Sequence, residues 1–214
     1  DKDILQNKQD YPPAVQIGSA LSKILQGASA ANGMIVRDTS FFYDLQPGPY
    51  EPSPKSRTGD QLSFFRATVD ASKGYLLKVK AAASAQKNLS KTYPPAGSNF
   101  LADQLKITAQ LIGGGLQTKV YIVNLKGFDT HDEQVQASDT TKGGHADLLS
   151  QVSVAIAAFE DDLALMGKQD KVLGMVYSEF GRRIKANASY GGDHGTAAPV
   201  LLFGSKLKQG LVGY

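Results

Sequence analysis

The stretch that decides the fold class is Lys119-Val120-Tyr121-Ile122-Val123-Asn124-Leu125, a short run rich in β-branched and aromatic residues. Runs of this kind are typical of buried strands. A helical pattern follows from about His145 to Met166, and Val172-Leu173-Gly174-Met175-Val176-Tyr177 is a second strand-like run. Strand, helix and strand at this spacing predict a βαβ unit, and therefore a parallel or mixed sheet flanked by helices.

The remaining elements extend this unit into an α/β arrangement. Pro199 to Phe203 predicts a third strand, whereas residues 13–26, 60–89 and 100–112 have the apolar spacing of helices, with Gly74 as a candidate break. We therefore predict one domain over residues 1–214, in which a helical first half packs on the sheet of the second half. Both ends of the chain look cut, and we expect an internal fragment of a longer domain.

Composition narrows the classes of function. The chain has 214 residues, of which 42% are hydrophobic, and 23 Lys and Arg against 20 Asp and Glu give a net charge of +3. These basic residues are scattered, so charge gives no support for nucleic acid binding. No apolar run approaches the roughly 20 residues of a membrane span. Cysteine is absent, so any metal must be bound by oxygen and imidazole ligands.

Residues of metal-ligand type lie at the ends of the predicted strands. Asp129 and His131 follow the first strand of the unit, and Glu179 follows the second directly. Asp193 and His194 lie between the second and third strands. Ligands of open α/β sheets bind outside the carboxyl ends of the strands, so these side chains are expected to converge. Two such clusters predict two divalent ions, among which Zn, Mn and Ca are not distinguished.

Each motif also has a purely structural interpretation. Asp and His are common in loops, where they cap helices and form turns. Glu179 is alternatively a loop carboxylate paired with Arg182 or Arg183, and His145 most simply opens the long helix rather than supplying a third imidazole. Arg182 and Arg183 are also the candidates for binding a substrate anion, because the guanidinium fork matches sulfate and phosphate oxygens.

Three motifs in this order resemble a bacterial family. They are Gly-Phe-Asp-Thr-His at 127–131, Ser-Glu-Phe-Gly-Arg-Arg at 178–183 and Asp-His-Gly at 193–195. Together they are similar to domain-of-unknown-function family fifteen hundred and one, which is placed in the alkaline phosphatase and sulfatase superfamily. The likeness extends upstream through residues 105–125 and, more faintly, to residues 12–15.

The resemblance implies a fold and a site. The fold would be an alkaline-phosphatase-like αβα sandwich, present here in part, with two bound metals. By position, Asp129 and His131 would serve the first metal, and Asp193 and His194 the second. Superfamily hydrolases also use a Ser or Thr nucleophile after an early strand, which no segment here fits, so we expect it upstream of Asp1. A further histidine ligand would follow His194, and no histidine does.

The resemblance also implies an exported hydrolase of sulfate or phosphate esters, located in the periplasm or outside the cell. Family members are often exported by a twin-arginine signal. The expected partner is an anionic ester, such as a sulfated or phosphorylated glycan. The alternative is a non-catalytic binding or assembly module at the cell surface, which retains the fold while its acidic and histidine residues are structural or bind one ion weakly.

Overall fold

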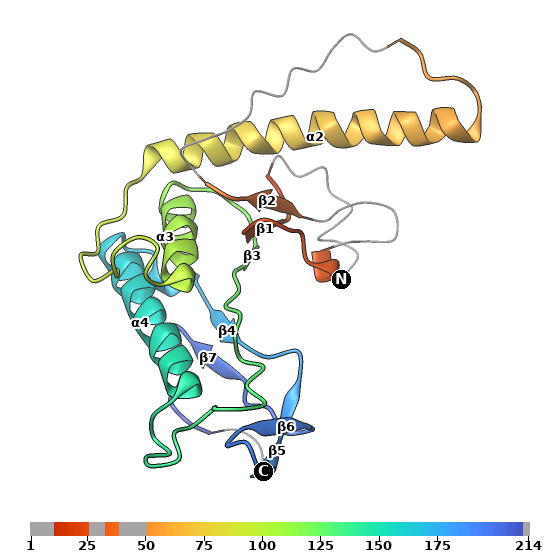
Figure 1. Ribbon diagram of the computed structural model, residues 1–214. Helices are drawn as coiled ribbons and strands as arrows, with labels where there is room; N and C mark the ends of the chain where they lie inside the picture. The colour runs from red at the N-terminus through yellow and green to blue at the C-terminus, as the bar shows by residue number, and fades with distance from the viewer. Residues whose placement is uncertain (1–10, 26–32, 39–50, 212–214) are drawn as a thin grey trace. The chain divides into compact units, whose positions relative to one another are not determined.

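The computed structural model describes residues 11–25, 33–38 and 51–211, without the side chains of 64, 65 and 67–71, and the structure is mixed α/β. The described residues form two compact units, whose helices and strands are labelled in Figure 1. Unit 1 takes its residues from 1–88 and 107–123, and unit 2 takes its residues from 89–106 and 124–214. Each unit is described by itself.

A parallel three-stranded sheet in the order β2-β1-β3 lies in unit 1 (Figure 1). Its strands are β1 (Ala14–Ile17), β2 (Met34–Val36) and β3 (Val120–Ile122). All four residues of the middle strand β1 are buried, including Gln16, whose side-chain oxygen accepts a hydrogen bond from the Ser22 amide at 2.7 Å. The one polar side chain of β1 is therefore satisfied.

The helix predicted over residues 13–26 is wrong. Residues 14–17 form β1, and Lys23–Leu25 forms only a short 3₁₀ helix, η1. Val15 and Ile17 fit both a helical and an alternating pattern, and a short strand that is buried throughout shows no period that separates the two. The first half is accordingly not wholly helical, and the sheet begins at β1 instead of near residue 119.

The other predicted helices are confirmed to within a few residues. They are α2 (Arg57–Ala85), α3 (Phe100–Gly113) and α4 (Gly144–Leu165), and α2 runs through Gly74 without a break. No described helix is both long enough and apolar enough to cross a membrane. The buried core of unit 1 combines apolar residues from its sheet and helices: Val15, Ile17, Val36, Val79, Ala82, Ala83, Leu111 and Leu116.

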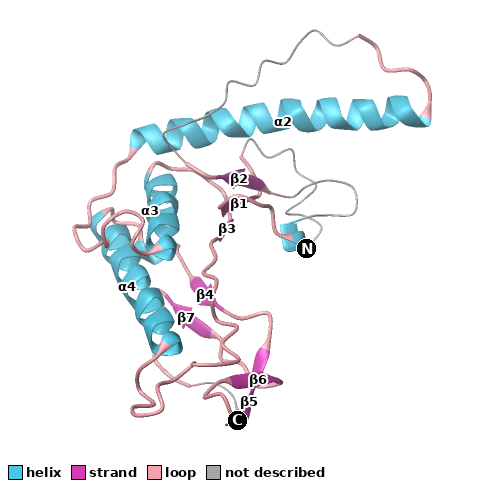
Figure 2. Cartoon of the chain, viewed as in Figure 1, coloured by secondary structure: helices cyan, strands magenta, loops and turns pink. Residues whose placement is uncertain are grey.

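Unit 2 contains α4 and two antiparallel strand pairs. The first pair joins β4 (Gly174–Val176) to β7 (Leu201–Phe203), both of which lie where strands are predicted. The second pair joins β5 (Gly181–Ala186) to β6 (Gly192–Gly195), which the sequence patterns do not predict. A long loop, drawn in pink in Figure 2, leads from β3 to the start of α4.

Two buried polar side chains tie the segment before α3 to α4. The Asn99 side-chain oxygen caps α3 by accepting hydrogen bonds from the Leu101 and Ala102 amides, both at 3.1 Å, and its amide group donates to the Gln151 carbonyl at 2.9 Å. Asp162 is fully buried on α4, and its Oδ1 accepts from the amides of Leu89 at 2.7 Å and Ser90 at 3.0 Å. These bonds fix the segment along the helix.

Replacing Asp162 with alanine removes the acceptor of two backbone amides. We expect Asp162→Ala to lower the free energy of unfolding by about 2–4 kcal/mol, because the amide of the buried Ser90, left unpaired, costs about 1–3 kcal/mol and that of the more exposed Leu89 adds about 1 kcal/mol. Asp162→Asn keeps an oxygen acceptor and should cost less. Chemical denaturation followed by circular dichroism measures both, with Asp161→Ala on the same helix as the control. An equal effect of Asp161→Ala and Asp162→Ala would contradict the anchoring role.

Candidate metal centre

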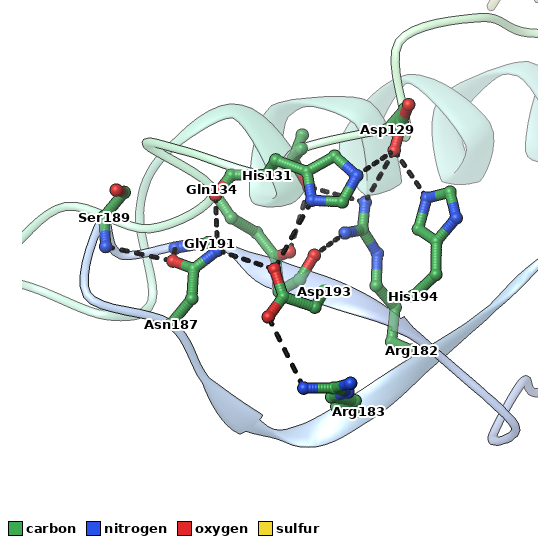
Figure 3. Close-up of polar contacts among 12 residues, drawn as sticks. Asp129, His131, Gln134, Arg182, Arg183, Asn187, Ser189, Gly191, Asp193 and His194 are labelled. Carbon is green, nitrogen blue, oxygen red and sulfur yellow. Dashed lines mark hydrogen bonds and ion pairs between the residues drawn. The ribbon is translucent and has the colours of Figure 1, made fainter.

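The candidate site lies in unit 2, beside the turn that joins β5 to β6. Asn187 organises this turn, because its side-chain oxygen accepts hydrogen bonds from the amides of Ser189 and Gly191, both at 3.0 Å, while its backbone amide donates to the Gly191 carbonyl at 2.9 Å. The Asn187 side-chain amide donates to the His131 carbonyl at 2.7 Å and to Asp193 Oδ1 at 3.2 Å. One side chain thus holds both predicted metal-binding segments (Figure 3).

The loop that carries Asp129 and His131 runs along the same turn. Backbone hydrogen bonds join Glu133 to Ser189 at 3.0 Å and Val135 to Tyr190 at 3.3 Å. A Cβ added at Gly191 would lie 2.0 Å from the His131 carbonyl oxygen, so only glycine lets the two backbones approach this closely. The close approach brings residues about sixty positions apart in the sequence into one site.

Arg182 on β5 joins the loop to β6. Its guanidinium donates to the backbone carbonyls of Gly192 and Phe128, and it donates to Thr130 Oγ1 at 3.3 Å. The side chain is only 22% exposed, and its nearest carboxylate oxygen, Asp129 Oδ1, is 3.8 Å away. A planar fork with several donors suits such a role, since each acceptor lies in a fixed direction.

Three donor atoms meet at the tip of this loop. Asp129 Oδ1 lies 2.8 Å from His194 Nε2 and 3.1 Å from His131 Nε2, and all three donor atoms lie within 4.8 Å of one another. Figure 3 shows the Asp129 carboxylate between the two imidazole rings. We call Asp129, His131 and His194 the donor group. Its side chains are about half exposed, so the donor atoms are open to solvent.

The donor group fits a transition metal. Zinc binds histidine nitrogen at about 2.0–2.1 Å and carboxylate oxygen at about 2.0–2.2 Å, so two ligand atoms on one ion lie at most about 4.2 Å apart. Asp129 Oδ1 lies within this limit of both imidazole nitrogens, at 2.8 Å and 3.1 Å, and no two of the three donor atoms are more than 4.8 Å apart. One carboxylate oxygen and two imidazole nitrogens form a donor set that Zn²⁺ and Mn²⁺ accept, whereas Ca²⁺ takes six to eight oxygen ligands.

Asp193 lies beside the donor group and contacts the other nitrogen of His131. Its Oδ1 is 3.6 Å from His131 Nδ1, and its Oδ2 is 3.8 Å from the Arg183 guanidinium. Carboxylates commonly face the second nitrogen of a metal-binding histidine, where they fix the orientation of the ring. The structure therefore groups the predicted ligands differently from the motifs, because His194 joins Asp129 and His131 while Asp193 supports His131.

The two aspartates are held in their ionised form. The pKa of Asp129 is lowered chiefly by its hydrogen bond with His194, and the nearby His131 and Arg182 act in the same direction. The pKa of Asp193 is lowered chiefly by the hydrogen bond from Asn187, with smaller contributions from His131 and Arg183. In both cases desolvation opposes the shift without reversing it. Ionised carboxylates are the form that binds cations.

The remaining predicted residues lie outside the donor group. Glu179 is exposed in the bend between β4 and β5, and among the described residues it pairs with neither Arg182 nor Arg183. His145 stands at the start of α4, as predicted, and its ring is nearly perpendicular to that of Phe128, at a centroid distance of 5.9 Å. The sequence patterns assign no role to Asn187. A polar residue shortly before a glycine-containing turn is the only signal for it.

The two neighbouring arginines should differ in their effect on stability. Arg182→Gln removes donors from two backbone carbonyls, and we expect it to lower the free energy of unfolding by about 1–3 kcal/mol. Arg183→Gln, at a side chain that is 68% exposed with one long ion pair, should cost less than about 0.5 kcal/mol. Denaturant titration of the two variants checks the difference. Equal stabilities would show that the Arg182 contacts do not hold the loop.

Comparison with known proteins gives one match. No curated protein and no solved structure matches the chain. A family model described as "Protein of unknown function (DUF1501)" matches residues 64–213, which include all three motifs and the whole donor group. The match covers more than half of the chain and agrees with the resemblance of the motifs. The chain therefore belongs to the DUF1501 family.

Proposed function

We propose that this protein is an exported, metal-dependent hydrolase-like member of the alkaline phosphatase and sulfatase superfamily, acting on sulfate or phosphate esters. The observation that carries the proposal is the convergence of Asp129, His131 and His194 on one point. The exposed Arg183 lies 3.8 Å from Asp193, the residue before His194. The αβα sandwich of that superfamily is part of the proposal. Its support is the mixed α/β structure with a parallel sheet and the three motifs in order.

The donor group would hold a divalent transition metal, with Zn²⁺ or Mn²⁺ favoured over Ca²⁺ by the two imidazoles. Such an ion, when bound, supplies a Lewis acid that polarises an ester oxygen and stabilises the charge that develops as sulfate or phosphate is displaced. The described residues assemble one donor group of this kind. The prediction of a second ion stays a prediction.

The residues around the donor group would bind the substrate or position the metal ligands. Arg183 is mostly exposed and contacts Asp193 only at 3.8 Å, so its guanidinium is available to bind the oxygens of an anionic ester. Arg182 has its donors engaged by the loop and β6, and it therefore positions Asp129 rather than the substrate. Asn187 holds the backbone of His131 and the carboxylate of Asp193 in place through the hydrogen bonds of its side-chain amide.

A non-catalytic binding module is the second candidate. The observation that favours it is the exposure of the donor group, whose side chains are 49–60% accessible to solvent, since hydrolytic sites usually exclude water from the reacting groups. In such a module the metal would stabilise a binding surface. An ester hydrolase activity that disappears in His194→Ala would eliminate this candidate.

Metal binding tests the donor group directly. We expect protein purified without chelator to contain zinc or manganese, and His194→Ala or Asp129→Ala to weaken zinc binding by more than about 100-fold, beyond the effect of changing an outer-shell residue. Elemental analysis and competition with a chromophoric chelator measure both. The control is Asp132→Ala, an exposed carboxylate of the same loop. Wild-type protein that binds no transition metal would refute the proposal.

Substrate recognition tests the assignment of Arg183. With an aryl sulfate or aryl phosphate as substrate, we expect Arg183→Gln to raise KM about tenfold, because the loss of one charge-assisted hydrogen bond costs about 1.5 kcal/mol. The zinc affinity of the variant should stay unchanged. A neutral carboxylic ester of the same aryl alcohol serves as the control substrate. An equal loss toward both substrates would contradict recognition of the anion.

A further inference from the structure

We propose that Phe180 is a positioning residue of the metal centre, which holds the His194 imidazole in the orientation that the donor group requires. This inference rests on the proposed metal binding at Asp129, His131 and His194. Phe180 belongs to the Ser-Glu-Phe-Gly-Arg-Arg motif, in which the acidic and basic residues have predicted roles and the aromatic ring has none. The structure places this ring directly against a predicted metal ligand.

The ring of Phe180 stacks on the ring of His194. Their centroids are 4.3 Å apart and their planes differ by 14°. The His131 ring also lies against the His194 imidazole, with ring centroids 4.8 Å apart and an angle of 32° between the planes. A stacked neighbour restricts rotation of the His194 ring about its side-chain bonds. With that rotation restricted, Nε2 of His194 stays directed at Asp129 Oδ1, 2.8 Å away.

The backbone brings Phe180 to this place. Gly181 at the start of β5 is paired with Gly195, and Arg182 is paired with His194, so the residue before β5 lies diagonally across from His194. A Cβ added at Gly195 would lie 2.6 Å from the backbone of Arg182 and Arg183. The glycine of the Asp-His-Gly motif thus permits the close approach of the two strands on which the ring contact depends.

The Phe180 ring is also in contact with Arg182 of strand β5. The guanidinium carbon of Arg182 lies 5.1 Å from the centre of the Phe180 ring, within the range of a cation–π contact. Arg182 in turn bonds to the carbonyls of Phe128 and Gly192. The ring is therefore braced by the residue that fixes the Asp129 loop, and one set of contacts sets the directions of both Asp129 and His194.

A stacked aromatic pair contributes about two- to tenfold to an equilibrium that depends on the ring orientation, equivalent to about 0.5–1.5 kcal/mol. We expect Phe180→Leu, which keeps an apolar side chain but no ring, to weaken zinc binding by this factor. Phe180→Ala should weaken it at least as much. Phe180→Tyr keeps the ring and should bind zinc as the wild type does.

The test is zinc titration against a chromophoric chelator for the wild type and the three variants. The ¹H resonance of His194 Cε1–H in the zinc-free proteins reports the stack independently, because loss of the ring current should shift it in the Leu and Ala variants alone. Denaturant titration gives the unfolding free energies. We expect the wild type and Phe180→Tyr to bind zinc equally well, and Phe180→Leu and Phe180→Ala to bind it more weakly.

Two results would overturn the inference in different ways. Equal zinc affinity in all four proteins would show that the ring does not position His194, while the proposed metal binding would stand. Affinities that follow only the unfolding free energies, with no change in the His194 resonance, would likewise exclude a positioning role for the ring. Absence of zinc binding by the wild type would refute the proposed function, and the inference with it.

Discussion

The guanidinium of Arg182 is the contact on which the candidate site depends. It donates hydrogen bonds to the carbonyl of Phe128, on the loop that carries Asp129, and to the carbonyl of Gly192, on the strand that carries His194. The central carbon of the guanidinium faces the ring of Phe180. Without it, the path of the long loop after β3 would depend on the turn at Asn187 and its backbone hydrogen bonds. A single side chain thereby couples the two motifs that supply metal ligands, because both are bound by the same rigid fork.

The geometry of strand β6 explains how the ligands are grouped. Consecutive residues of a strand point to opposite faces, so Asp193 and His194 on β6 cannot both face one point without distortion. His194 meets Asp129, and Asp193 meets His131 Nδ1 from the other side. The motif Asp-His-Gly therefore contributes one donor to the group and one carboxylate that orients a donor. Short motifs define which residues are chemically able to act, whereas strand geometry decides which of them act together.

Much of the secondary structure can be predicted because the sequence has a clear spacing of apolar residues and clear signals at the ends of its elements. α2, α3 and α4 and strands β3, β4 and β7 lie where their patterns predict them, although with different ends. The strand β1 escapes prediction because four buried residues in succession carry no period, and β5 and β6 escape it because Arg182, Arg183 and Lys185 give β5 a polar composition. The sequence predicts Asp129, His131 and His194 as ligands, but the roles of Asn187 and Phe180 depend on contacts between distant segments that no local pattern encodes.

The central claim is that Asp129, His131 and His194 bind one transition metal together. X-ray absorption at the zinc K-edge of the zinc-loaded protein tests it most directly, since imidazole ligands give a characteristic outer-shell scattering. We predict two imidazole ligands with zinc–nitrogen distances of about 2.0–2.1 Å, one of which is lost in His194→Ala. A spectrum of oxygen ligands without imidazole, unchanged in His194→Ala, would contradict the claim.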